Sequence, residues 1–232
     1  VVLPLEHVAE VAHAVRRDRA FEKRVPSSGI AEIDRFGRDF NALLAELQGW
    51  HAGLTSENAE LARRATHDNL TGLGNRQLFD QHLGEMIAQS QRTGAPFALI
   101  YLDVDQFKSI NDGYGHDAGD AALIAVAERL RSAIRHVDQA FRLGGDEFAV
   151  VLAPFFNQAH VDGVIDRIRL AMELSYRLPN GMAVTSMLSV GVAIFPEHAD
   201  SAEALVKKAD MAMYKDKQGR QGPPENGALS NA

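Results

Sequence analysis

The first quarter of the chain places apolar residues at helical spacing. A short helix is predicted from about Pro4 to Asp18, because its apolar positions recur at intervals of four and three and share one stripe. These positions are Val1, Leu5, Val8, Ala12 and Val15. A polar connector containing Pro, Ser and Gly follows from Arg19 to Gly29, and a much longer helix is predicted from Glu32 to Arg64.

The longer helix carries a regular heptad seam. One heptad position holds Ile33, Phe40, Leu47, Leu54 and Leu61, and the other holds Phe36, Leu43 and Trp50. Two apolar positions in every seven residues are the pattern of a coiled coil. We therefore expect this helix to pair with another helix along the seam.

Beyond residue 66 the pattern changes to alternating helices and strands. Helices are expected at Gln77–Thr93, Ala121–Arg135, Asn157–Tyr176 and Ser201–Lys217, and strands at Phe97–Leu102, in a hairpin over 141–152 and at Met182–Phe195. Residues 111–120 are expected to form a loop. The predicted fold class is α/β, an α+β sandwich whose central sheet contains antiparallel strands and is covered by helices, because the hairpin requires antiparallel neighbours.

The composition narrows the class of protein. The chain has 232 residues, 46% hydrophobic and 24% charged, which allows one sizeable core and a smaller module. A formal net charge of -7 argues against a nucleic-acid polymer as partner, because polymer binding needs a basic face. The lack of cysteine excludes disulfides and thiolate metal sites. No apolar run reaches the length of a membrane span, and the first residues are not typical of a signal peptide.

The hairpin is the first stretch with candidate chemistry. Gly144 and Gly145 lie between two apolar runs, which predicts a tight turn with positive φ angles. Asp146 and Glu147 follow directly, so the turn carries two carboxylates. A phosphate could approach the glycine backbone while the carboxylates hold Mg²⁺. Taken alone, the same residues also fit an ordinary solvated hairpin.

A second pair of acids ends the apolar strand at 97–102. Asp103 and Asp105 follow that strand, and packing alone does not explain acids at this point. Carboxylates at the end of a central strand are well placed to meet those of a neighbouring hairpin. Such hard oxygen ligands favour Mg²⁺ or Mn²⁺.

Four motifs, taken in their order, resemble the GGDEF domain of bacterial diguanylate cyclases. They are DNLTGLGNR at 68–76, DVDQFKSIND at 103–112, RLGGDEF at 142–148 and ADMAMY at 209–214. The resemblance covers roughly Thr66 to Arg220 and implies a nucleotidyl-cyclase-like fold. It also implies that two GTP molecules are condensed into cyclic di-GMP, with release of two pyrophosphates, by two chains that face each other.

The resemblance also implies a metal site and a catalytic pair. Mg²⁺ or Mn²⁺ would be bound by Asp103, Asp146, Glu147 and the carbonyl of Val104. Glu147, with Asp146, would be catalytic, and Glu147 would help to deprotonate the 3′-hydroxyl of GTP.

Nucleotide contacts are implied along the same motifs. Asn111 and Asp120 would bind guanine, since a carboxylate can accept from its N1–H and N2 amine, although a turn and an N-cap explain these residue types equally well. Phe107 is expected to pack beneath the site, with Lys108 beside it. The complete set of expected contacts is Phe107, Lys108, Asn111, Asp120, Gly144, Gly145, Lys217 and Arg220.

The end of the last helix departs from the family pattern. Family members have a Lys and an Arg that reach the triphosphate, separated by two residues and a glycine, whereas only Gln218 and Gly219 separate Lys217 from Arg220. The missing residue turns Arg220 by about a quarter of a helical turn, which favours Lys217 as the phosphate contact. This shortening favours the alternative function, a catalytically inactive GTP-binding sensor that acts through dimerisation.

Arg135 and Asp138 lie just before the hairpin. Six positions separate Asp138 from Gly144, a spacing that matches the family's inhibitory site, at which an Arg and an Asp bind the product cyclic di-GMP. A surface salt bridge is the simpler explanation of the same two residues.

The N-terminal helices resemble a HAMP domain through Glu32, Ile33 and the run FNAL at 40–43. The expected organisation is a HAMP-like module at 1–49, a coiled-coil signalling helix at 50–66, a GGDEF domain at 67–220 and a disordered tail at 221–232. The resemblance implies a parallel homodimer, a transmembrane or sensor region upstream of this chain, and a location on the cytoplasmic side of a bacterial inner membrane. A plain dimerisation coil is the alternative, and it predicts a parallel dimer too.

Overall fold

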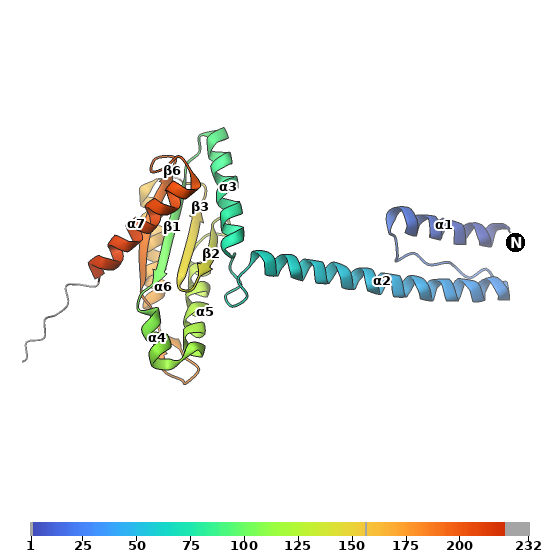
Figure 1. Cartoon of the computed structure of the whole chain (residues 1–232). Helices are drawn as coiled ribbons and strands as arrows, with labels where there is room; N and C mark the ends of the chain where they lie inside the picture. Colours follow the sequence, from blue (N-terminus) through green and yellow to red (C-terminus); the bar gives the residue numbers. More distant parts are fainter. Residues whose placement is uncertain (1, 156, 221–232) are drawn as a thin grey trace, which may run out of the picture. The chain divides into compact units, whose positions relative to one another are not determined.

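The structure is a computed structural model that describes residues 2–155 and 157–220 (Figure 1). The chain divides into two compact units between Arg63 and Arg64, called here the N-terminal unit and the globular unit. The tail predicted at 221–232 and the predicted apolar position Val1 lie outside the described residues. No helix in the described ranges is long and apolar enough to cross a membrane.

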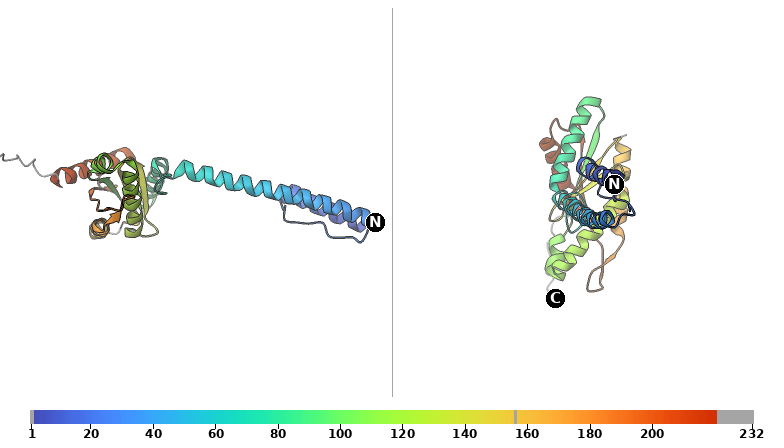
Figure 2. Two further views of the ribbon diagram at one scale, coloured as in Figure 1. Left: turned by 90° about the horizontal axis from the view of Figure 1, so that it is seen from below. Right: turned by 90° about the vertical axis from the view of Figure 1, so that its right-hand side faces the viewer.

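The N-terminal unit contains α1 (Val2–Asp18) and most of α2 (Ala31–Thr66). Figure 2 shows α1 lying alongside α2, and their contact is a small apolar cluster around Val11, Val25 and Leu44. The connector is fixed to α2 by Asn41, whose side chain accepts from Val25 N at 2.8 Å and donates to Val25 O at 3.0 Å. The predicted stripe on α1 was partly wrong, because Val11 is buried while Leu5 is 55% exposed.

Most of the predicted heptad seam of α2 is uncovered. Its large exposed apolar side chains are Phe36, Leu43, Trp50, Leu54 and Leu61, called here the exposed seam. Phe40, itself a seam residue, and Leu44 belong to the apolar cluster with α1, and Phe40 stacks on the exposed Phe36. The contact with α1 therefore covers only the edge of the seam, and the five side chains of the exposed seam stay uncovered.

The globular unit is built on an antiparallel sheet. Its described strands are β1 (Phe97–Val104), β2 (Gln139–Gly144), β3 (Glu147–Leu152) and β6 (Leu188–Phe195), in the order β2-β3-β1-β6. All the pairings in this sheet are antiparallel. The predicted fold class, with helices covering an antiparallel sheet, is confirmed.

Helices cover both faces of this sheet (Figure 1). Alternate residues of β1 pack on opposite sides, so Leu102 lies in one core cluster and Tyr101 in the other. The first cluster includes residues of α5 (His116–Ala133) and α6 (Gln158–Glu173), and the second includes residues of α3 (Arg76–Thr93) and α7 (Ala202–Arg220). Every residue of β1 is buried, as its continuous apolar run indicates.

Two predicted boundaries were wrong. The expected loop at 111–120 instead contains part of α4 (Phe107–Tyr114) and the start of α5, because a single Gly115 with φ of 86° makes the break between them. The expected long strand from Met182 is interrupted, since β5 (Ala183–Val184) pairs with β4 (Tyr176–Arg177) in a separate small sheet and β6 begins at Leu188.

Candidate active site at the end of the central strand

The two acidic stretches meet at one end of the sheet. Asp103 and Glu147 are direct partners in the β1–β3 register. Val104 N donates to Asp146 O at 3.1 Å, which ties the strand end to the hairpin tip. Between them, the turn uses Gly144 and Gly145 with φ of 144° and 53°, as the sequence predicts. The acids therefore come together, although their chemical roles remain predictions.

Asp103 is the most buried acid of this group. Its side chain is 12% exposed, and Lys217 Nζ lies 2.6 Å from its Oδ1. Burial raises the pKa of Asp103; Lys217 acts in the opposite direction, and the negative charge of Asp146 adds to the rise. The same hydrogen bond raises the pKa of Lys217, so this lysine is charged. Lys217 and Asp103 are 114 positions apart in the sequence and are brought together by the fold.

The oxygen atoms at this strand end fit a hard cation. No group of three or more His, Cys, Asp or Glu side chains suited to a metal occurs among the described residues. The donors at hand are the carboxylate of Asp103, that of Asp146, whose charge acts on Asp103, and the backbone at Val104; they suit Mg²⁺ when phosphate and water complete its ligands. Asp105 is held separately, because it accepts from Ser189 Oγ at 2.5 Å.

Glu147 faces a different set of partners. Its Oε2 accepts from Tyr101 Oη at 3.3 Å and from Arg76 Nη2 at 3.4 Å. Burial and the charge of Glu147 raise the pKa of Tyr101 to about 12, so the phenol remains a proton donor. Arg76 also donates to Leu143 O at 3.1 Å, which places this arginine across the hairpin. Arg76 was visible as the end of the DNLTGLGNR motif, but its contact with Glu147 was not predicted, and Tyr101 was not singled out from the sequence.

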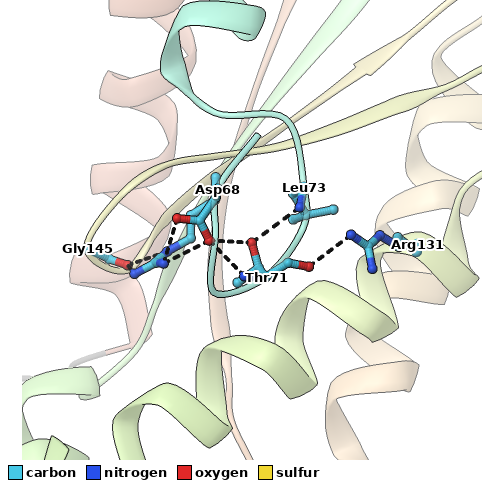
Figure 3. Close-up of polar contacts among 6 residues, drawn as sticks. Asp68, Thr71, Leu73, Arg131 and Gly145 are labelled. Carbon is cyan, nitrogen blue, oxygen red and sulfur yellow. Dashed lines mark hydrogen bonds and ion pairs between the residues drawn. The ribbon is translucent and has the colours of Figure 1, made fainter. Parts of the chain in front are cut away.

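The turn before α3 is bonded to the hairpin tip (Figure 3). Asp68 accepts from Thr71 and from Arg142 Nη1 at 3.0 Å, and Arg142 donates to Gly145 O at 2.9 Å. On the other side of the turn, Arg131 donates to Thr71 O at 2.9 Å. Burial alone would raise the pKa of Asp68, but the hydrogen bonds from Thr71 and Arg142 outweigh it and the pKa is lowered.

Asp68 pairs with Arg142 of the hairpin and not with Arg76 of its own motif, which contacts Glu147. The two partners are 74 positions apart, a separation at which spacing gives no signal. Arg142 and Asp68 were each visible as part of a motif, but their pairing was not predicted.

The residues expected to bind guanine lie on two neighbouring helices. Asn111 is in α4, and Asp120 is exposed inside α5, so neither has the turn or N-cap role that their types also suggested. A Cβ on Gly119 would collide with Asn111 Oδ1, so the glycine allows the amide to lie against α5 beside Asp120. Phe107 packs on the core below, and Lys108 is exposed.

Lys217 and Arg220 go to different partners. Lys217 contacts Asp103, whereas Arg220 Nε lies 3.2 Å from Asp216 Oδ2, one turn back along α7. Arg220 is thereby paired with an acid of its own helix, consistent with the shortened spacing.

The expected product site lines a large hollow. Asp138 is buried and accepts from Arg135 N at 2.9 Å, so its carboxylate closes a short turn. Both residues line a cavity of about 870 Å³ that also borders His67, Arg131 and the turn before α3. Arg135 and Asp138 therefore border a space that a ligand can enter, and product binding there stays a prediction.

A helix-covered antiparallel sheet that brings strand-end acids to a glycine hairpin defines a nucleotidyl-cyclase-like domain. Residues 65–222 match the family described as "Diguanylate cyclase, GGDEF domain", and the chain belongs to this family.

The order of a HAMP-like module followed by a GGDEF domain predicts similarity to the cyclase YfiN in particular, and this similarity is confirmed. The chain is 48% identical over 214 residues to the diguanylate cyclase TpbB of Pseudomonas aeruginosa, covering 92% of this chain and 49% of TpbB. The solved GGDEF domain of that protein, TpbB or YfiN, superposes with a TM-score of 0.64 at 43% identity, covering 67% of this chain and 90% of the solved one.

A second solved relative includes a helical segment. The coiled coil and GGDEF domain of DgcB from Caulobacter crescentus, in complex with c-di-GMP, matches with a TM-score of 0.69 at 28% identity, covering 78% of this chain and 95% of the other. This chain spans about half the length of the curated relative TpbB.

Proposed function

We propose that this chain is a diguanylate cyclase. The 3′-oxygen of one GTP attacks the α-phosphorus of a second, a new P–O bond forms, and the bond to the β-phosphate oxygen breaks to release pyrophosphate. The same step in the opposite direction closes the ring, so two GTP molecules give one cyclic di-GMP and two pyrophosphates. Each 3′-hydroxyl loses one proton, which a nearby base must accept.

The observation that carries this proposal is the pairing of Asp103 with Glu147 across β1 and β3, beside the turn at Gly144 and Gly145. This arrangement puts carboxylates and a backbone that a phosphate can approach at one place. The names of relatives that match over most of this chain support the same activity.

Each candidate residue has a role in this reaction. Asp103, Asp146, Glu147 and the carbonyl of Val104 would hold Mg²⁺ or Mn²⁺, which when bound supplies charge neutralisation at the phosphates and a more acidic 3′-hydroxyl. Glu147 accepts the proton, and its contacts with Tyr101 and Arg76 orient its carboxylate. Asn111 and Asp120 recognise guanine, and Lys217 binds the triphosphate. Gly144 and Gly145 admit the phosphates, while Phe107 and Lys108 support the guanine side.

The reaction requires two chains, and we propose that α2 supplies the contact. The exposed seam, which includes Leu43 and Trp50, is an apolar stripe at coiled-coil spacing that a second copy would cover. Residues 1–49 would act as a HAMP-like module and 50–66 as the signalling helix. In this proposal the chain is the cytoplasmic portion of a bacterial inner-membrane protein with a sensor region upstream.

Product binding at Arg135 and Asp138 is part of the proposal. The large cavity beside them supports a ligand at that place, and the DgcB relative is described in complex with c-di-GMP. Arg135→Ala should weaken binding of cyclic di-GMP added in excess, with little effect on the rate measured before product accumulates.

The test is direct. Purified protein is incubated with GTP and Mg²⁺, and cyclic di-GMP and pyrophosphate are quantified. Two pyrophosphates for each cyclic di-GMP are expected, with a specific activity that rises with protein concentration. If the wild type binds GTP but makes no product, the proposed cyclase function is wrong and the chain is a GTP-binding sensor. The pairing of Arg220 with Asp216 favours this alternative.

A further inference from the structure

Asp216 joins three parts of the globular unit at the edge of the sheet. It lies on α7, directly before Lys217, and its Oδ2 accepts from the backbone N of Val190 in β6 at 2.9 Å. Its Oδ1 lies 3.6 Å from Arg169 Nη2 on α6, and Arg220 Nε lies 3.2 Å from its Oδ2. The side chain of Asp216 is 26% exposed, so these contacts are partly shielded from water.

The bond to Val190 satisfies a backbone group that the sheet leaves open. β6 is an edge strand of the described sheet, and Val190 itself is buried. A buried backbone N–H without a partner is costly, and no neighbouring strand of the described sheet lies on this side of β6. Asp216 therefore does for Val190 what the next strand would do in the interior of a sheet.

A second contact holds α7 close to β6. A Cβ on Gly191 would collide with Ala209 O and with Met213 N, so the helix backbone lies directly on this glycine. Gly191 and Val190 are adjacent in β6, and they contact α7 at Met213 and Asp216 respectively. Two contacts one turn apart fix both the distance of the helix from the strand and its rotation.

We propose that Asp216 is the positioning residue for Lys217. Lys217 Nζ lies 2.6 Å from Asp103, and Lys217 is the next residue after the anchor that fixes the end of α7. Arg169 and Arg220 hold the Asp216 carboxylate in place from two sides. Where Lys217 contacts the triphosphate, this inference rests on the proposed function.

In this assignment Arg220 and Lys217 have different roles. Arg220 lies four positions after Asp216, a spacing that brings the two side chains together on the helix, and its Nε lies 3.2 Å from Asp216 Oδ2, whereas Lys217 contacts Asp103. Arg220 is accordingly a partner of the anchor and not a phosphate ligand. Arg220→Ala should then change KM for GTP far less than Lys217→Ala does.

The first experiment needs no activity. Lysines of the wild-type chain are labelled with an amine-reactive reagent, and the rates at Lys217 and at the exposed Lys215 are followed by mass spectrometry. In Asp216→Ala, the rate at Lys217 should rise by about fivefold or more, because the ammonium is released from Asp103, while the rate at Lys215 stays unchanged. Asp210→Asn, which removes an exposed acid from the same helix, is the matched control and should change neither rate.

The second experiment separates positioning from general stability. Asp216→Ala should raise KM for GTP by about tenfold with kcat within about threefold, and it should add little to Lys217→Ala in the double variant. Asp216→Asn retains an oxygen that can accept from Val190 N, so its KM for GTP should lie between those of the wild type and Asp216→Ala. Independent, additive effects of Asp216→Ala and Lys217→Ala on KM, or an unchanged labelling rate at Lys217, would overturn the proposal. If the wild type makes no cyclic di-GMP but Lys217 becomes reactive in Asp216→Ala, the cyclase assignment fails and the positioning role holds.

Discussion

The N-terminal unit and the globular unit differ in how far they bury their large apolar side chains. In α2, Trp50 is 69% exposed and Leu54 61%, whereas Leu102 and Phe148 in the sheet have no exposed surface. The residues of α2 follow a seven-residue period, whereas Leu102 and Phe148 belong to continuous apolar runs. The globular unit closes its core within one chain, but a heptad seam is completed only by another helix. The catalytic activity should thus depend on packing within the globular unit, and the regulation of that activity on the association of two chains.

The largest expected effect lies in the globular unit. Asp103→Asn should lower the rate of cyclic di-GMP formation by about a thousandfold at every protein concentration, because a carboxylate that serves the phosphates is lost. The free energy of unfolding of Asp103→Asn should not fall, although its activity does. Since the pKa of Asp103 is raised, its ionised form opposes folding, and the wild type gains stability as pH falls toward that pKa while the variant does not.

Activity and chemical unfolding of Asp103→Asn are measured in parallel with Glu203→Gln, an exposed acid on α7 that serves as control. A variant that keeps more than a tenth of the wild-type rate would remove Asp103 from the proposed metal site.

Core packing gives the next largest effect. Leu102→Ala should lower the free energy of unfolding of the globular unit by about 3 kcal/mol, because a fully buried side chain leaves a cavity. Leu54→Ala, the same change in the exposed seam, should cost less than about 0.5 kcal/mol in dilute protein. Denaturant unfolding, followed by near-ultraviolet signals, measures both. Equal costs would contradict the division into a closed core and an open seam.

The sequence was informative where periodicity and motifs are local. It predicted β1, the hairpin and its glycine turn, because an apolar run and a Gly-Gly pair each specify their own conformation. It missed α4, since Asn111 and Asp112 beside Gly113 have the composition of a loop, and the surface of a short helix can carry the same residues. It could not pair Asp68 with Arg142, Arg76 with Glu147 or Asp216 with Val190, because such contacts depend on how distant elements pack.

A charge in the exposed seam should have a smaller and conditional effect. The double variant Leu43→Glu and Trp50→Glu should reduce activity by about thirtyfold in dilute protein, because carboxylates would be buried between two helices. Raising the protein concentration should restore most of the rate, unlike in Asp103→Asn. Ala45→Glu places a charge on another side of α2 and is the control. Sedimentation and activity are followed together, and a loss of rate that concentration does not repair would argue against a dimer through this seam.

The smallest expected effect concerns the turn beside the hairpin and depends on pH. Asp68→Asn should cost about 1 to 2 kcal/mol at neutral pH, because its partly buried carboxylate accepts charged hydrogen bonds from Arg142. The pKa of Asp68 is lowered in the folded chain, so its contribution is complete above the ordinary value of 3.8 and is lost as pH falls through the lower, folded value. The difference in the free energy of unfolding between wild type and variant should therefore be constant from neutral pH down to about pH 4 and shrink below it.

Asp34 of the N-terminal unit is the comparison. Its pKa is also lowered, through its bond from Ser28 N, but solvent screens it, so Asp34→Asn should show a weaker pH dependence. Equal pH profiles for the two variants would mean that burial beside Arg142 adds nothing to the turn.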